Sequence, residues 1–279
     1  MMKGFVGDRV MVNGMTDFRL PVSTLPYRLR LLNASNSRIY RLAWQDGRPL
    51  TEIGTDGGLL ERPTERRDVY LSPGERIEFW VDFSDDPIGS QTSLVSLPFD
   101  TGMGLMGGGM MMGDGRRALE PLPNGSEFPI FSTKVLNRVR ETQSLPRRLS
   151  YIGQARPKTA LNYYSPRRFT MSMNHMRWAI NGRTFQMDDV ADDEIVQIGT
   201  SEVWEFFNTG SGMGMMGMMD MPHPIHLHGK QFQILERGGL MHSGYVDEGW
   251  KDIVLLMPGE QIRFLVGFDD YPGILYRPR

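Results

Sequence analysis

The stretch DVYLSPGERIEFWVDF, from Asp68 to Phe83, returns later in the chain as DIVLLMPGEQIRFLVGF, from Asp252 to Phe268. Each copy contains an apolar run, then the turn-forming residues Pro-Gly-Glu, and then a second apolar run. The run from Ile77 to Val81 alternates between faces, which favours a strand with one buried side. The repeat therefore predicts the same strand–turn–strand unit in both halves of the chain.

Two further pairs of segments repeat in the same order. An Asn-Gly pair ends a β-rich run at Val10–Gly14 and again at Trp178–Gly182, and YRLRLLN at Tyr27–Asn33 corresponds to EVWEFFN at Glu202–Asn208. Asn-Gly is a strong hairpin signal because both residues tolerate positive φ. A period of about 170 residues is far longer than the ~20 to 50 of solenoid repeats, so it indicates two similar domains. Short strands separated by turn residues favour two β-sandwiches.

We expect a first domain at residues 1–120 and a second domain at residues 165–279. Residues 121–164 between them are rich in proline, serine and charge. This composition predicts a linker that crosses from one sandwich to the next. A chain of 279 residues is long enough to give each domain its own core.

Composition excludes several classes of protein. The formal net charge of -2 gives no electrostatic case for binding nucleic acid or an anionic membrane. The chain has no cysteine, which excludes a disulfide framework and a thiolate metal site made from its own residues. It contains neither a basic-then-apolar signal peptide nor an apolar run near the roughly 20 residues of a membrane span, so neither is expected.

The segment HPIHLHG, from His223 to Gly229, holds three of the five histidines of the chain. In an extended strand, His226 and His228 point to one side and His223 points to the other. One strand could therefore supply ligands to two metal centres. Imidazole suits copper, zinc, iron and nickel, so the ligand type leaves the metal open. The alternative is a set of surface or hydrogen-bonded histidines, but three in seven residues favour a metal site.

This segment resembles the His-Pro-x-His-x-His-Gly motif of the multicopper oxidases, which include laccases, bilirubin oxidases and cuprous oxidases. The resemblance implies that His223 is a type 1 copper ligand, His226 a type 2 ligand and His228 a type 3 ligand. It also implies two cupredoxin-like, Greek-key β-sandwich domains, the middle and last domains of the family. Segments that are familiar from bacterial members include Leu29–Ala34, Gly54–Gly58, Pro73–Arg76 and Asp247–Asp252.

Several parts of the family's copper machinery have no counterpart in this chain. The type 1 thiolate of the family comes from a His-Cys-His segment that follows a stretch resembling Asp269–Gly273, whereas this chain continues as Ile274–Arg279. The first domain of the family, with two His-x-His pairs, has no match here either. We therefore expect a second sandwich without its C-terminal strand, association through the exposed strand edge, and no oxidase activity from this chain alone.

Many of the 21 methionines lie in two glycine-rich clusters, Met103–Met112 and Met213–Met221. Interleaved glycine removes any fixed helical or strand period, so these are not core stripes. One interpretation is an adaptable loop, and the other is capture of Cu(I) by soft thioether sulfur. The resemblance favours Cu(I), because cuprous oxidases carry Met-rich segments near the type 1 site. The second cluster, which precedes His223, has the stronger claim as metal ligands, namely Met213, Met215, Met216, Met218, Met219 and Met221.

The resemblance also singles out Asp252, in the segment Trp-Lys-Asp. Cuprous oxidases have an acidic residue there, close to the type 1 copper, where it could bind a cationic substrate or exchange protons. The alternative is a structural hydrogen-bond acceptor. His175 and His242 match no ligand position and are expected to be structural or surface residues.

Three functions remain open at the level of sequence. The first is a copper-binding portion of a multicopper oxidase, which oxidises phenols or Cu(I) and reduces O2 to water, and which the resemblance places in the periplasm or outside the cell. The second is a copper-binding or copper-free cupredoxin scaffold of the cell envelope. The third is complementation, in which a separate chain supplies the missing domain and strand.

Overall fold

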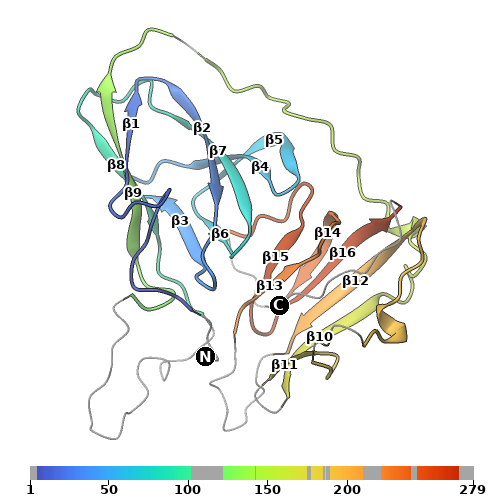
Figure 1. Cartoon of the computed structure of the whole chain (residues 1–279). Helices are drawn as coiled ribbons and strands as arrows, with labels where there is room; N and C mark the ends of the chain where they lie inside the picture. Colours follow the sequence, from blue (N-terminus) through green and yellow to red (C-terminus); the bar gives the residue numbers. More distant parts are fainter. Residues whose placement is uncertain are drawn as a thin grey trace, which may run out of the picture.

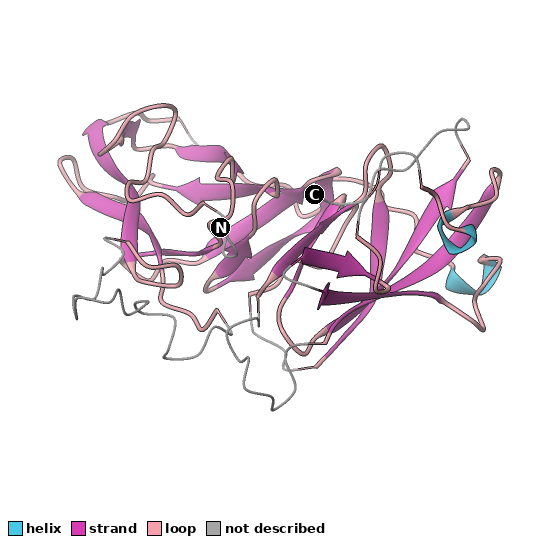
Figure 2. Cartoon of the chain, turned by 60° about the horizontal axis from the view of Figure 1, so that its bottom comes forward, coloured by secondary structure: helices cyan, strands magenta, loops and turns pink. Residues whose placement is uncertain are grey.

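The computed structural model describes residues 5–101, 122–141, 143–174, 177–184, 186, 189–209, 221–239 and 244–269. Strands and turns dominate this part of the chain, and its only helical segments are the short 3₁₀ turns η2 (Pro157–Thr159) and η3 (Asp192–Glu194), drawn in cyan in Figure 2. None of the described helices is long and apolar enough to cross a membrane. Two groups of strands lie next to each other, the first blue to green and the second yellow to red (Figure 1).

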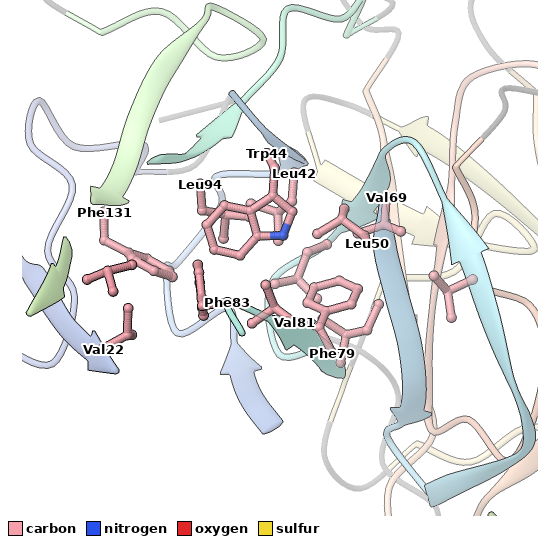
Figure 3. Close-up of a cluster of buried hydrophobic side chains, with 14 residues drawn as sticks. Val22, Leu42, Trp44, Leu50, Val69, Phe79, Val81, Phe83, Leu94 and Phe131 are labelled. Atoms are coloured by element: carbon pink, nitrogen blue, oxygen red, sulfur yellow. The ribbon is translucent and has the colours of Figure 1, made fainter. Parts of the chain in front are cut away.

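The first half consists of two sheets that pack face to face. One has the order β1-β9-β8-β3-β6 and the other the order β2-β7-β4-β5. The strands are β1 (Arg19–Ser23), β2 (Pro26–Leu32), β3 (Tyr40–Trp44), β4 (Leu50–Thr55), β5 (Gly58–Arg66), β6 (Val69–Leu71), β7 (Arg76–Asp82), β8 (Gln91–Ser96) and β9 (Phe128–Asn137). Their inner faces enclose a core in which Trp44 meets Phe83 and Phe131 edge to face, each at a centroid distance of 6.2 Å (Figure 3).

The second half repeats this arrangement with a five-stranded sheet, β11-β10-β12-β16-β14, and a two-stranded sheet, β13-β15. The strands are β10 (Arg167–Asn174), β11 (Arg177–Ile180), β12 (Thr200–Asn208), β13 (His223–His226), β14 (Phe232–Gly238), β15 (Ile253–Leu256) and β16 (Gln261–Phe268). A row of stacked rings fills its core, with Phe264 at 5.6 Å from Phe206 and 4.1 Å from Phe232 between centroids.

The predicted repeat is present in the backbone. The Pro-Gly-Glu turns join β6 to β7 and β15 to β16. Strand β7 buries Ile77, Phe79 and Val81 and turns the residues between them outward, as the alternation predicts. Both Asn-Gly pairs have positive φ, 51° at Asn13 and at Asn181, and each closes a two-residue hairpin. The predicted all-β fold with two sandwiches is confirmed.

The prediction of a linker at residues 121–164 was wrong for Phe128–Asn137. This segment is β9, which pairs in parallel with β1 and antiparallel with β8. Phe131 and Val135 on this strand are buried in the first core, which explains why the segment folds as part of the sheet. The first sandwich therefore includes residues beyond the predicted boundary at residue 120.

The two halves share buried contacts where β6 approaches β15. Val246 lies in the core of the first half. A smaller cluster combines Ile39 and Tyr70 with Tyr245, Leu255 and Met257. The histidine-bearing strand β13 pairs with β15, so this contact surface lies directly behind the histidine motif.

Candidate metal centre

The histidine motif starts on strand β13 and continues into the following turn. Antiparallel pairing sets His223 opposite Leu256 and His226 opposite Ile253. Ile225 is buried in the second core. Because side chains alternate along an extended chain, His226 and His228 point away from the face that carries Ile225. Their rings lie 4.6 Å apart between centroids.

His223 lies on the other side of the strand, against an aromatic side chain. Its ring centroid is 4.6 Å from that of Trp178 on β11, and the two rings meet edge to face. Burial lowers the pKa of His223 to about 4. The imidazole is therefore neutral at neutral pH, which is the form that binds a metal.

The ring of His226 is oriented by a backbone carbonyl. Its Nδ1 lies 2.8 Å from the carbonyl oxygen of Asp252. A carbonyl can only accept a hydrogen bond, so Nδ1 carries the proton and Nε2 keeps its lone pair. Metal-binding histidines commonly donate their second nitrogen to a carbonyl or carboxylate in this way. His226 is thus prepared to offer Nε2 as a donor.

The side chain of Asp252 lies beside His226 and is held by the first half of the molecule. Arg76 donates from Nη1 to Oδ1 at 2.7 Å and from Nη2 to Oδ2 at 2.6 Å. Oδ1 is 3.8 Å from Nδ1 of His226. The resemblance implies an acidic residue at this position close to the type 1 copper. In the structure the carboxylate lies beside His226, the residue predicted as a type 2 ligand.

A buried lysine stands next to Asp252 in the sequence. Lys251 is fully buried, and its Nζ lies 2.5 Å from Oε1 of Glu75 and 3.1 Å from Oδ2 of Asp56. Burial alone lowers a lysine pKa, but the two carboxylates outweigh it and raise the pKa of Lys251. The ammonium is therefore charged and joins the second half to two acidic groups of the first.

The sequence alone did not identify Arg76, Asp56 and Lys251 as neighbours of the motif, although their segments are familiar from bacterial multicopper oxidases. A usable signal was present in the repeat. The Pro-Gly-Glu turn is followed by Arg76 in the first half and by the uncharged Gln261 in the second. Because only the first copy of the repeat has a charged residue at this position, that residue is expected to bind a group that the second copy does not contact.

Other predicted site residues lie outside the described part of the chain: His175, His242, Met213, Met215, Met216, Met218 and Met219. Met221 is described, and its backbone oxygen accepts a hydrogen bond from Nδ2 of Asn208 at 2.8 Å. Within the described residues, no group of three or more His, Cys, Asp or Glu side chains could hold a metal ion. The motif can therefore offer separate imidazoles to two centres, but it does not form a closed site by itself.

These donors fit copper only in part. His226, with its free Nε2, and His228 beside it fit the imidazole ligands of a type 2 or type 3 copper. His223 fits as one imidazole of a type 1 copper, but that centre also needs a thiolate, and the chain contains no cysteine.

Comparison with known proteins points to the multicopper oxidases. A family model described as multicopper oxidase matches residues 160–276. The laccase of Bacillus subtilis (strain 168) is 27% identical over 295 residues, which cover 96% of this chain and 50% of the laccase. The cell division protein FtsP of Escherichia coli (strain K12) is 34% identical over 267 residues, which cover 95% of this chain and 49% of FtsP.

Among solved structures, the McoA multicopper oxidase of Aquifex aeolicus is 31% identical and superimposes with a TM-score of 0.76, covering 97% of this chain and 55% of McoA. The chain spans about half the length of the curated relatives it matches. The family-model match identifies residues 160–276 as a multicopper oxidase domain, and the structural similarity extends the fold of these oxidases over nearly the whole chain.

Proposed function

We propose that this chain is a copper-binding portion of a multicopper oxidase. In this proposal His226 and His228 are ligands of the O2-reducing cluster, and His223 is a ligand of the mononuclear type 1 copper. The observation that carries the proposal is the hydrogen bond from Nδ1 of His226 to the Asp252 carbonyl, which leaves Nε2 free next to His228. The match to the multicopper oxidases supports copper as the metal.

Bound copper would supply one-electron chemistry that couples oxidation of phenols or Cu(I) to the four-electron reduction of O2 to water. The residues of this chain hold and orient the donors. Burial keeps His223 neutral, and the Asp252 carbonyl fixes the tautomer of His226. Since the chain has no cysteine, we expect no blue type 1 copper and no phenol oxidation from this chain alone.

Two parts of the proposal rest on family resemblance. The first is a periplasmic or secreted location. The second is capture of Cu(I) by the methionines of the segment Met213–Met221, next to His223 in the sequence. Thioether sulfur prefers Cu(I) over harder divalent ions, which gives this cluster a chemical rationale.

A second candidate is a cupredoxin scaffold of the cell envelope that binds copper weakly or not at all. It is favoured by the relatives named cell division protein FtsP, which are up to 34% identical, compared with 27% for the Bacillus subtilis laccase. The two candidates differ in one property that can be measured, which is copper binding at the histidine motif.

The experiment that tests the proposal is copper loading of the purified chain, followed by metal analysis, visible spectra and EPR. We expect non-blue Cu(II) in the unmodified chain and its loss in the double variant His226→Ala, His228→Ala. The matched control is His242→Ala, which removes a histidine outside the motif and is expected to bind copper normally. Binding at background level in all variants would support the scaffold instead. An intense blue band would contradict our expectation that the type 1 centre cannot form.

A further inference from the structure

We infer that Arg76 is a positioning residue for His226, acting from the other half of the molecule. Arg76 holds Asp252 in place, and the carbonyl of Asp252 then selects the tautomer of His226 that presents Nε2. The role of this arrangement in copper binding rests on the proposed function, whereas the control of the tautomer does not.

The backbone carbonyl of Asp252 orients the ring of His226. It accepts two hydrogen bonds, from Nδ1 of His226 at 2.8 Å and from the backbone N–H of Leu227 at 3.0 Å. The same oxygen thus fixes both the ring of His226 and the chain immediately after it. A displacement of Asp252 would change the orientation of the histidine ring.

Arg76 holds the side chain of Asp252 in place. The guanidinium donates to both carboxylate oxygens of Asp252, at 2.7 and 2.6 Å. It also donates to the carbonyl oxygens of Gly74 at 3.2 Å and Asp56 at 3.0 Å. A planar fork with two parallel bonds restricts the carboxylate more tightly than a single charge would. Arg76 therefore ties Asp252 to two turns of the first half.

The backbone of the first half lies very close to the residues on both sides of Asp252. Gly57 donates its N–H to the carbonyl of Trp250 at 2.8 Å. A Cβ atom at Gly57 would lie 2.3 Å from Cβ of Trp250, and one at Gly74 would lie 2.6 Å from Cδ1 of Ile253. Real Cβ atoms do not approach so closely, so the packing at Gly57 requires glycine, whereas the methyl group that faces Gly74 belongs to a side chain that can rotate. The segment that orients His226 is seated on the first half.

Arg76 could instead serve only to hold the two halves together, but other contacts already do so. Lys251 binds Glu75 and Asp56 across the same boundary. Arg66 binds Glu248 across it as well. The loss of Arg76 should therefore leave the halves joined, and its specific effect should appear at His226.

The repeat supplies a substitution that the fold already accepts at this place. Gln261 follows the Pro-Gly-Glu turn in the second half at the position equivalent to Arg76, and strand β16 begins there without disruption. Arg76→Gln is thus expected to fold while it removes both the charge and the fork. Glu248→Gln is the matched control, because it weakens a contact between the halves without touching Asp252.

The test is long-range ¹H–¹⁵N NMR of the metal-free chain at about pH 8, above the ordinary histidine pKa, with His226→Ala used for assignment. We expect the Nδ1–H tautomer for His226 in the unmodified chain and in Glu248→Gln, and a mixture with the Nε2–H form in Arg76→Gln. Cu(II) affinity at the motif should fall by roughly 10-fold or more in Arg76→Gln, the range seen when such hydrogen-bond partners are lost.

The outcomes separate this inference from the proposed function. A pure Nδ1–H tautomer in Arg76→Gln would overturn the positioning role and leave the copper proposal intact. A tautomer that responds to Arg76→Gln in a chain that binds no copper would support the positioning role and overturn the proposed function. If Arg76→Gln does not fold, Asp252→Ala removes the same contact from the other side while keeping the carbonyl, and the same change of tautomer is expected.

Discussion

The two Pro-Gly-Glu turns have the same backbone but different partners. In the first, the N–H of Asn33 donates to the carbonyl of Glu75 at 3.1 Å, and in the second Asn208 donates to the carbonyl of Glu260 at 3.0 Å. The side chain of each glutamate also accepts a hydrogen bond from the backbone N–H of the residue three positions earlier. The distance is 2.8 Å for Glu75 and 2.9 Å for Glu260. The turn is therefore one local solution that the sequence uses twice.

The cation that each glutamate binds is different. Glu260 is bound by Arg237 at 3.2 Å and by the hydroxyl of Tyr245 at 2.8 Å, both from its own half. Glu75 is bound by Lys251 from the other half, at 2.5 Å. The same acidic turn thus closes a domain internally in one copy and joins two domains in the other. The two copies therefore keep the same turn and differ in the cation that binds its glutamate, and in the first copy that cation comes from the other half.

The largest effect should follow from Lys251→Met. Glu75 and Asp56 would then remain at the boundary without their cation, and breaking a buried ion pair from one side costs about 3–5 kcal/mol. We expect a loss of that order in the free energy of unfolding, measured by urea denaturation. Lys134→Met, at an exposed lysine, is the control and should change stability little. A loss below about 1 kcal/mol would mean that Lys251 contributes no more than a surface ion pair.

A second effect concerns Glu52, which is fully buried and bound to Arg66 at 2.6 Å. Burial raises the pKa of Glu52 to about 7 from its ordinary 4.5. A raised folded-state pKa makes ionisation unfavourable, so stability is highest below the unfolded pKa and is lost as pH rises through about 7. Arg66 also binds Glu248 of the second half, so Glu52 is linked through Arg66 to the contact between the halves.

The corresponding substitution is Glu52→Gln, which cannot ionise. We expect the stability difference between Glu52→Gln and the unmodified chain to grow in favour of the variant between pH 4.5 and pH 7, by at most about 3 kcal/mol. Urea denaturation at several pH values measures it. Parallel pH profiles for the two proteins would show that Glu52 does not titrate in this window.

The sequence predicted those parts of the fold that depend on local rules. Positive φ at Asn181 and the buried side of β7 follow from residue type and alternation alone. Strand β9 was missed because residues 121–164 were assigned to a linker by their overall composition. Phe131, Thr133 and Val135 are buried at alternate positions, and only the bulge opposite Leu94 and Val95, ahead of them, interrupts the alternation.

The candidate site was predictable to a smaller extent. Alternation along the motif correctly separates His223 from His226 and His228 in direction. The contact between Arg76 and Asp252 joins residues 176 positions apart, and no local pattern encodes that distance. The resemblance singled out Asp252, but its contacts with His226 and Arg76 could not be predicted, because a motif conveys residue order and not the packing of the other half against it.

A third effect tests the close approach that the first half allows. Gly57→Ala would bring a Cβ within 2.6 Å of the carbonyl oxygen of Trp250, and neither group can move without shifting backbone. Overpacking of this kind costs about 1–3 kcal/mol. Thermal or urea unfolding should show that loss. Gly153→Ala is the control, since no atom lies within 4 Å of its added Cβ, and an equal effect in both variants would contradict the importance of this contact.

The smallest effect compares the two turns directly through Gly74→Ala and Gly259→Ala. Both glycines have positive φ, 83° and 79°, so each substitution carries the same backbone strain of about 1 kcal/mol. The Cβ at Gly259 meets nothing within 4 Å, whereas the Cβ at Gly74 meets Cδ1 of Ile253 at 2.6 Å. Because that methyl group can rotate away, we expect Gly74→Ala to be the more destabilising of the two by less than about 1 kcal/mol. Equal losses by urea denaturation would mean that only the strain of the shared turn is felt, and that Ile253 adapts to the first half at no cost.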